Sequence, residues 1–407
     1  MSIILSMGFR NIFRNSRRSV ITSSVVALGL FSMVLMDGFT TGFFEYLIRA
    51  STSDFYGEAR IRNTEYDEYP NNKDVLIQPQ DIISILKANP AIVGYAPRTL
   101  LLGMLASAEN SRNIQVVGID PELEGSFSKL KARMVDGNFL DSSKGRILLG
   151  KDLASRLGLN VGDKLVFTTT DAKAGELVQE LYRVGGIFQF HNKHLDENIA
   201  FIDLAESQRI LGLSSGLHEV ALKFKTSVDM FHYYETHKGQ FAQPGNTLKT
   251  WREFLPALNA MIGMSKESLA TVGIVLAILV AFTVMNTIHM SLYERVFEFG
   301  VMRAVGTRRG FIKRLIFFEC FFIGVFGVLI ALAFTLVVGG YLSVYGVDYS
   351  NTSYMNVRMR DPIYFHFSAW ATCLYSLITV IFVGAISFYP SGKILKILPC
   401  DSLRQRG

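Results

Sequence analysis

Residues 268–292 read SLATVGIVLAILVAFTVMNTIHMSL, and this run decides the fold class. It contains no Asp, Glu, Lys or Arg. A helix rises about 1.5 Å per residue, so the run would reach about 37 Å and exceed the roughly 30 Å hydrocarbon core of a bilayer. Lipid offers no hydrogen-bonding partner, so a backbone inside it must be a helix or part of a closed barrel. The run therefore predicts a membrane-spanning helix, which we place at residues 266–292.

Three further apolar runs predict helices of the same kind, at residues 20–47, 315–345 and 365–389. The composition agrees, because 49% of the 407 residues are hydrophobic and 19% are charged, which is too apolar for a soluble enzyme of this length. We expect an α-helical membrane protein with four transmembrane helices. A large extracytoplasmic α/β domain at residues 48–265 would lie between helices 1 and 2.

Basic residues predict the orientation. The N-terminal segment 1–19, the loop 293–314 and the tail 390–407 together hold fourteen basic and three acidic residues. Lys and Arg beside membrane helices are retained in the cytoplasm, so both termini and this loop should be cytoplasmic. The domain at 48–265 and the short loop 346–364 should then lie outside. Removing the excess of eleven positive charges from the overall +6 leaves −5 for the rest of the chain, so the charge gives no support to nucleic-acid binding.

The first apolar stretch is too long for a cleavable signal peptide and lacks a convincing cleavage site, so we expect an uncleaved anchor. The three cysteines, Cys320, Cys373 and Cys400, fall in the third helix, the fourth helix and the tail. The outer domain therefore has none and must fold on its hydrophobic core without disulfides.

Within the outer domain, short apolar runs alternate with short amphipathic segments. Asn89-Pro90 stops a helix that begins at Pro79, since a residue before proline avoids the helical region. Period-two patterns and turn residues predict the strands. The expected elements are helices at 79–88 and 152–157 and strands at 92–106, 113–119, 146–149 and 164–170. We also expect one long helix from Arg252 to Leu292, with Pro256 and Gly263 as points of kinking.

Two stretches in this domain imitate ligand sites. Residues 145–152, GRILLGKD, resemble a phosphate-binding loop, but Asp152 stands where a Ser or Thr should hold magnesium, and the central residues predict a buried strand. Residues 191–197, HNKHLDE, have metal-ligand side chains, but their spacing fits a solvated loop better. No Ser/His/Asp or Cys/His arrangement stands out. We expect no catalytic residue, metal or cofactor in this chain.

The loop after the second helix is the most informative part of the chain. Three apolar residues recur there at helical spacing: Phe297, Val301 and Val305. Glu298 can pair with Arg295 three residues earlier, and Gly306 suits a helix end. The pattern predicts a short amphipathic helix at the inner membrane surface. Two interpretations are open: an interfacial helix held to anionic headgroups, or a docking helix for a cytoplasmic partner.

The same loop carries a resemblance to a known family. The residues concerned are Asn286, Glu294-Arg295, Glu298-Phe299-Gly300, Met302 to Thr307 and Glu319. Residues 9–18 and 36–39 fit as well, and so does the tail from Tyr389 to Arg404, apart from Asp401 and Ser402, where Glu and Ala are usual. The chain resembles the FtsX-like (MacB/FtsX) ABC transporter permeases, most closely the lipoprotein-release (LolC/LolE-like) branch.

The resemblance implies a permease subunit that has no ATPase domain of its own. It would pair with a separate ABC ATPase, which binds ATP and Mg, and with a second permease chain, identical or related. It further implies a periplasmic core-type outer domain and a place in the bacterial inner membrane. The residues expected to couple to the ATPase are Glu294, Arg295, Glu298, Gly300, Arg303, Ala304, Gly306 and Thr307.

Extraction of lipoproteins or lipid-linked cargo is the leading hypothesis, with a periplasmic carrier or adaptor among the candidate partners. Met and Phe adapt to flexible apolar ligands, so the outer end of the first helix could contact acyl chains. The candidate residues are Met33, Met36, Phe39 and Phe43; alternatively they face lipid or a neighbouring helix. Two other functions are open: export of a peptide or amphiphilic small molecule through an adaptor, and mechanical regulation of a cell-wall hydrolase.

Gly38 and Gly42 have the small-xxx-small spacing that lets helix backbones approach closely. This spacing could serve pairing between two permease chains or packing within one chain.

Overall fold

The computed structural model describes residues 2–14, 16–141, 145–173, 175–190, 192–242, 245–350, 352–354 and 357–394. The chain divides into two compact units. The helical unit holds the described residues of Met1–Phe44, Ile262–Asp348 and Pro362–Gly407, and the sheet unit holds those of Glu45–Met261 and Tyr349–Asp361. The chain therefore enters the sheet unit twice.

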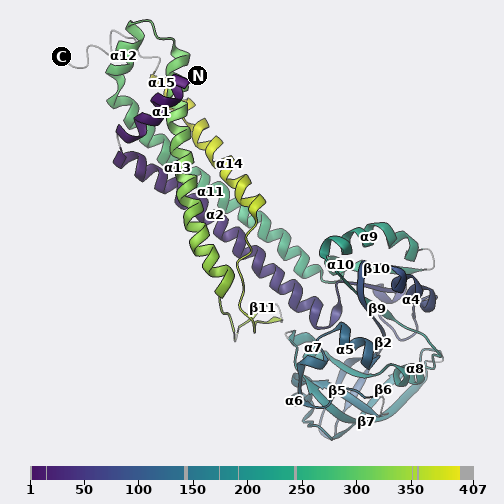
Figure 1. The fold of residues 1–407 in the computed structure, drawn as a ribbon. Coiled ribbons are helices and arrows are strands. Elements are labelled where there is room, and N and C mark those ends of the chain that lie inside the picture. The colour runs from purple at the N-terminus through teal and green to yellow at the C-terminus, as the bar shows by residue number, and fades with distance from the viewer. Residues whose placement is uncertain are drawn as a thin grey trace. The chain divides into compact units, whose positions relative to one another are not determined.

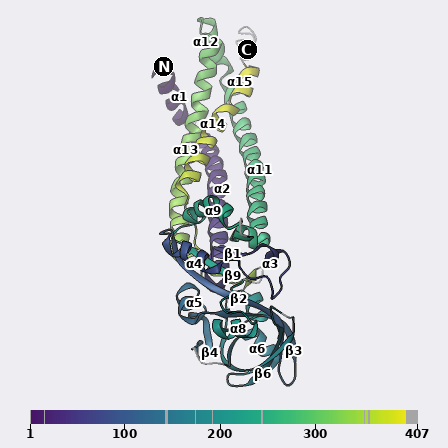
Figure 2. The ribbon, with the colours of Figure 1, turned by 90° about the vertical axis from the view of Figure 1, so that its right-hand side faces the viewer.

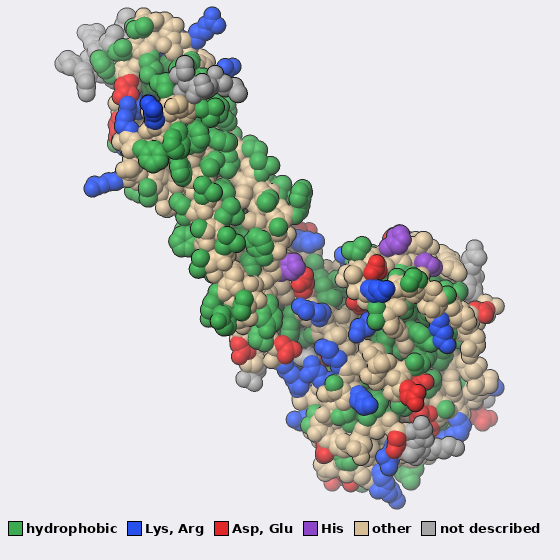
Figure 3. Space-filling view, in the orientation of Figure 1, with side chains coloured by type: hydrophobic (Ala, Val, Ile, Leu, Met, Phe, Trp, Pro, Cys, Tyr) green, Lys and Arg blue, Asp and Glu red, His purple; other side chains and the backbone are tan. Residues whose placement is uncertain are grey.

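Four long helices belong mainly to the helical unit: α2 (Ser16–Ser51), α11 (Pro256–Glu294), α13 (Arg309–Tyr345) and α14 (Ala369–Ile386). They run side by side (Figures 1 and 2). In the described part of the chain, four helical segments are long and apolar enough to cross a membrane. Hydrophobic side chains cover the visible face of these helices (Figure 3). Four candidate transmembrane helices are thus confirmed, whereas their membrane boundaries and orientation stay predictions.

Small residues let these helices approach one another. A Cβ at Gly327 of α13 would lie 2.7 Å from a methyl of Val26 on α2, so this crossing requires glycine. Nearby, one buried cluster draws on all four helices, with Val26, Val284, Ile316 and Val383 among its members. The four helices therefore share a packed core at this level.

Two helical segments differ from the prediction. The expected helix from Arg252 to Leu292 is divided into α10 (Trp251–Phe254) and α11, which begins at Pro256. Proline has no N–H to donate and fits the first turn of a helix, so Pro256 starts α11 and does not kink it. The N-terminal segment, predicted only as basic, forms the amphipathic helix α1 (Ser2–Arg14). Its Phe9 ring lies 5.5 Å from the ring of Phe322 on α13.

The sheet unit contains a ten-stranded mixed sheet in its described residues. The strands are β1 (Ala59–Asn63), β2 (Ile92–Ala106), β3 (Ser111–Ile119), β4 (Met134–Gly137), β5 (Arg146–Gly150), β6 (Lys164–Thr170), β7 (Leu177–Phe188), β8 (Ile199–Asp203), β9 (Glu219–Phe224) and β10 (Asn246–Thr250). Successive pairings β2–β3–β8–β5–β7–β6–β2 close a ring of six strands. The first half of β2 pairs instead with β9, which continues to β1 and β10. The long strand β2 therefore joins both parts of the sheet.

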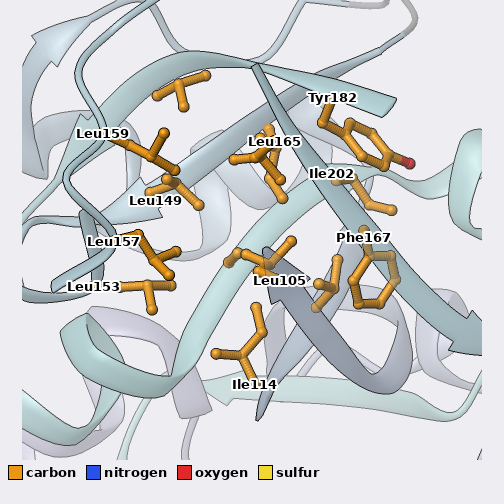
Figure 4. Packing of buried hydrophobic residues seen from close by; sticks show 14 of the residues in the cluster. Leu105, Ile114, Leu149, Leu153, Leu157, Leu159, Leu165, Phe167, Tyr182 and Ile202 are labelled. Carbon is orange, nitrogen blue, oxygen red and sulfur yellow. The ribbon is translucent and has the colours of Figure 1, made fainter. Parts of the chain in front are cut away.

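Hydrophobic side chains from all six strands of the ring form one core with helix α6 (Lys151–Leu157) (Figure 4). The strands contribute Leu105, Ile114, Leu149, Leu165, Tyr182 and Ile202, and the helix contributes Leu153 and Leu157. Each of these side chains is nearly or fully buried. The sheet unit has no cysteine, so this packing takes the place of disulfides.

Shorter helices surround the sheet: α3 (Thr64–Glu68), α4 (Pro79–Ala88), α5 (Pro121–Phe127), α7 (Lys193–Asn198), α8 (Leu204–Ile210) and α9 (Ser227–Ala242). The helix predicted at 79–88 and the strands predicted at 92–106 and 164–170 have the expected bounds, and the other predicted elements differ by one or two residues. Gly158 ends α6 in the left-handed conformation, as its position predicted. Local patterns therefore located the parts of this unit correctly.

The stretch predicted as a short loop, residues 346–364, contributes to the sheet unit. Its strands β11 (Ser353–Tyr354) and β12 (Val357–Arg358) pair with each other, and Val357 also bridges to Asn192. Residues 349–361 therefore pack with a domain that precedes them by about a hundred residues in sequence.

A fully buried arginine connects the two parts of the sheet. Arg98 lies in the middle of β2, and its guanidinium donates to Glu124 Oε1 at 2.7 Å and to Glu219 Oε1 at 3.0 Å. It also donates to the Phe55 carbonyl at 2.7 Å. Burial alone would raise the pKa of Glu219, but Arg62 and Arg98 lower it to about 2. Glu219 is thus held as an anion beside a buried cation.

Arg98→Ala should lower the free energy of unfolding of the sheet unit by about 3–5 kcal/mol, because buried Glu124 would lose its cation and buried Glu219 would keep only Arg62. Urea unfolding of the full chain in a Trp370→Phe background would report this through Trp251. Arg112→Ala, on an exposed part of β3, is the matched control and should leave the unfolding curve nearly unchanged. Equal stability of the Arg98 and Arg112 variants would contradict this assignment.

Candidate functional site

The predicted amphipathic helix is present between the second and third long helices as α12 (Val296–Ala304). It ends at Gly306, whose φ of +97° lies in the region that glycine favours, so the predicted stop is confirmed. The predicted apolar stripe lies on the exposed side of the helix, with Phe297, Val301 and Val305 accessible. Phe299 and Gly300 face inward and are buried. One apolar side of α12 thus packs on the bundle, and a second is available to lipid or to a partner.

Arg295 fastens α12 to the third long helix. Its guanidinium is buried and donates to Glu298 Oε2 at 3.1 Å and to Glu319 Oε2 on α13 at 3.0 Å. It also lies over the ring of Phe299 at 5.0 Å. The predicted Arg295–Glu298 pair is therefore confirmed, and its partner on α13 is Glu319.

Two N-terminal arginines, which the sequence marked only as signs of orientation, contact the acidic residues of this loop. Arg14 donates to both oxygens of Glu298 at 2.9 Å. Arg18 donates to both oxygens of Glu294, at 2.9 and 2.7 Å. Burial alone would raise the pKa of Glu298, but the hydrogen bonds from Arg14 and Arg295 lower it. No local spacing could have shown these pairs, because each joins residues more than 270 positions apart.

The residues expected to couple to an ATPase therefore divide into two groups. Glu294, Arg295 and Glu298 hold the short helix in place through bonds within the chain. Ala304 and Gly306 are exposed at the C-terminal end of α12 and present little side-chain bulk. Gly300 is buried, and Arg303 and Thr307 are half-buried. The first group positions the helix, and the exposed end is the part that a bulky partner could reach.

An apolar cavity of about 290 Å³ opens between three long helices of the helical unit. Met33 and Gly29 of α2, Gly273 of α11 and Tyr375 and Phe382 of α14 are among the residues that line it. Met33 is close to Gly273, where a Cβ would lie 3.1 Å from the Met33 methyl, so the missing side chain leaves space at this point. The sequence did not single out the residues from α11 and α14, because only the fold brings them together.

Of the four candidate acyl-chain residues, Met33 lines this cavity. Met36 is exposed at 39% and does not line it, nor do Phe39 and Phe43. Phe43 instead contacts the ring of Phe44 at 5.5 Å. Of these four candidates, Met33 is thus the residue that lines the cavity, and nothing in the sequence distinguished it from the other three.

Gly38 and Gly42 pack against the chain's own segment before α14. A Cβ at Gly38 would lie 2.2 Å from the ring of Phe365, and one at Gly42 would lie 2.0 Å from the Tyr364 carbonyl oxygen. The His366 N–H also donates to the Gly38 carbonyl at 3.1 Å. These contacts favour packing within one chain, the alternative that the sequence left open.

The two stretches that imitate ligand sites have structural partners. Arg146–Gly150 is strand β5, as predicted, and Asp152 accepts a hydrogen bond from Arg358. In the second stretch, Asp196 is buried and also accepts from Arg358, while Glu197 pairs with Arg156 at 2.6 Å. His191 lies outside the described residues, as does the tail after residue 394.

Comparisons with known proteins match most of the chain. The model of the MacB-like periplasmic core domain matches residues 19–232, and that of the FtsX-like permease C-terminal region matches residues 270–399. The chain is 21% identical over 347 residues to the lipoprotein-releasing system transmembrane protein LolC of Xylella fastidiosa, covering 80% of this chain and 81% of that protein. It is 22% identical over 375 residues to LolE of Haemophilus influenzae, covering 85% of each.

Two further matches are to proteins whose names do not mention lipoprotein release. The uncharacterized ABC transporter permease MJ1507 of Methanocaldococcus jannaschii is 20% identical over 410 residues, covering 98% of this chain and 97% of that protein. The solved periplasmic region of MacB from Actinobacillus actinomycetemcomitans has a TM-score of 0.34 and 14% identity, covering 49% of this chain and 92% of that one.

Four helices that are long and apolar enough to cross a membrane, joined to a mixed-sheet domain, have the architecture of an integral membrane protein. Within that class, the chain belongs to the family of FtsX-like ABC transporter permeases with a MacB-like periplasmic core domain. Permeases of this family work with an ATPase, so an ATPase partner is implied for this chain too.

Ala304→Trp should abolish copurification of the ATPase if the exposed end of α12 enters a cleft of that partner, because overpacking a formed interface costs about 1–3 kcal/mol or more. Ala304→Ser keeps the small size and should retain the ATPase. Tryptophan is favoured at the headgroup level, so a helix that only lies on the membrane would tolerate it. Wild-type ATPase recovery from Ala304→Trp would therefore remove the docking interpretation.

Proposed function

We propose that this permease extracts lipoproteins or lipid-linked cargo from the outer face of the inner membrane, driven by a separate ATPase. The observation that carries the proposal is the apolar cavity between α2, α11 and α14, which lies within the segments long enough to span the bilayer. The lining of the cavity is almost entirely apolar. The relatives named as lipoprotein-releasing proteins support the same substrate class.

Removal of an acyl chain from the bilayer into water needs an input of free energy. An acyl chain in a bilayer is already surrounded by hydrocarbon, so moving it into an apolar cavity gains little free energy. Removing it into water costs about 0.8 kcal/mol for each methylene exposed. The cavity can therefore accept a chain at low cost, but release toward the aqueous side needs an external source of energy. ATP hydrolysis in the partner, with its own Mg, would supply it.

In this proposal the chain itself is non-catalytic. Both termini and α12 lie in the cytoplasm, the sheet unit lies in the periplasm, and a second permease chain, identical or related, completes the transporter. The position of α12 would respond to the ATPase through Arg295 and its partner Glu319 on α13. Cargo would be handled at the outer face without crossing the whole membrane.

A release assay tests the substrate class. The complex with its ATPase, reconstituted in liposomes that contain a triacylated protein, should release that protein when ATP is added. Met33→Trp would fill the cavity and should reduce release by about tenfold, with ATP hydrolysis retained. Leu336→Trp, at an exposed position on α13, is the control and should release normally.

No ATP-dependent release by the wild type would overturn the proposed substrate. In that case, ATP-dependent transport of a peptide or an amphiphilic dye would support export through an adaptor. Copurification of a cell-wall hydrolase would support mechanical regulation instead.

A further inference from the structure

The connection between α13 and α14 carries a segment, residues 357–361, that we call the strap. It belongs by sequence between two helices of the helical unit and by packing to the sheet unit. Val357 and Met359 are each 4% exposed, so the strap is embedded in that unit. The Arg360 N–H donates to the hydroxyl of Tyr46 at 3.1 Å.

Arg358 of the strap sits between two carboxylates of the sheet unit. One of its terminal nitrogens donates to Asp196 on α7, and the other donates to Asp152 in the first turn of α6. Asp196 is fully buried, and Arg358 and Asp152 are exposed at only 22% and 25%. The second oxygen of Asp196 accepts the Phe190 N–H at 2.8 Å. Without Arg358, both carboxylates would lose the cation that they share.

The strap follows α13 in the sequence, so movement of that helix can be transmitted to it. α13 begins at Arg309, shortly after α12 ends, and runs without interruption to Tyr345. The strap follows about a dozen residues later. A displacement at α12 would therefore pass along α13 to Tyr345, and residues 346–356 connect that helix to the strap. The helices α2 and α11 join the sheet unit separately.

We propose that Arg358 is a positioning residue whose ion pairs with Asp152 and Asp196 fasten the strap to the sheet unit, so that movement of α13 is passed to that unit. The clasp, defined as these three residues, stays closed throughout the transport cycle. This proposal rests on the proposed coupling to an ATPase but not on the identity of the cargo.

Hydrogen exchange in the full complex tests the clasp without any cargo. Adding ATP and vanadate should change exchange in α6 and α7 of the wild type. Arg358→Ala should remove that change and reduce any cargo release by at least about tenfold, while ATP hydrolysis stays within about twofold. Arg360→Ala, an exposed neighbour whose backbone contact is kept, should behave as the wild type.

A disulfide distinguishes positioning from a loss of folding. Asn192 and Val357 are partners in a β-bridge, so cysteines at both positions can be joined there. In a background without Cys320, Cys373 and Cys400, oxidised Asn192→Cys/Val357→Cys should restore the exchange response to Arg358→Ala, and reduction should remove it again. An absent response in the wild type, a normal response in Arg358→Ala, or no rescue by the formed disulfide would each overturn the proposal.

The clasp should also depend on pH. The net pKa of Asp196 is raised to about 6, mainly by burial. Asp152 also raises this pKa, whereas the Phe190 N–H and Arg358 lower it. Because Arg358 lowers this pKa, Asp196 binds a proton more tightly when the strap is detached. The ion pair therefore favours docking while Asp196 is ionised, and this contribution is lost as the pH falls through about 6.

A nitroxide at Tyr354→Cys should become more mobile between about pH 7.5 and pH 5, and the same label with Asp196→Asn should be mobile across the range. With Arg360→Ala the label should follow the wild-type profile. A label that is equally immobile at both pH values, or that keeps its pH dependence in Asp196→Asn, would contradict the role of this carboxylate.

Discussion

A backbone amide in hydrocarbon has no water to bond, and the rest of this structure depends on that constraint. It requires continuous helices through the bilayer and moves charged groups toward the helix ends. α11 and α13 accordingly run for 39 and 37 residues without a break. Charges are brought together near the ends of these helices, as at Glu294 of α11 and Glu319 of α13. The recognisable polar contacts of the chain therefore concentrate at α12, in the strap and in the sheet unit.

Three arginines are prominent in those contacts, and each joins separate elements of the fold. Arg98 connects the two parts of the sheet, Arg295 connects α12 to α13, and Arg358 connects the strap to α6 and α7. Buried ion pairs contribute little net stability, because desolvation offsets most of the attraction, but losing one partner is costly. Such pairs suit positions where the geometry must stay fixed while force passes through. A planar guanidinium that binds two carboxylates fixes that geometry better than an ammonium group would.

Features governed by local pattern could be predicted from the sequence. The strand at 164–170, the helix at 79–88, the stop at Gly306 and the Arg295–Glu298 pair all follow from spacing within a few residues. Features that depend on contacts between distant parts of the chain could not be predicted from the sequence. The partners of Arg14 and Arg18, the cavity beside Met33 and the role of Arg358 each require elements brought together across most of the chain. The Pro256 boundary was misjudged for another reason: proline is as compatible with a first turn as with a kink, and only the fold distinguishes them.

The cavity and α12 have complementary limits, which explains why the permease needs both. An apolar cavity binds an acyl chain about as well as lipid does, so affinity alone cannot move cargo out of the bilayer. A short helix anchored by Arg295 can receive force, but no residue of α12 lines the cavity. The helices α11 and α13 begin or end beside α12, and α11 also lines the cavity. A shift of α12 that moved α11 against α2 would change the space around Gly273 and Met33, where a difference of one methyl group fills the gap. Small residues in this wall thus make the volume of the cavity sensitive to helix position, and in the proposed function a modest movement would expel a bound chain.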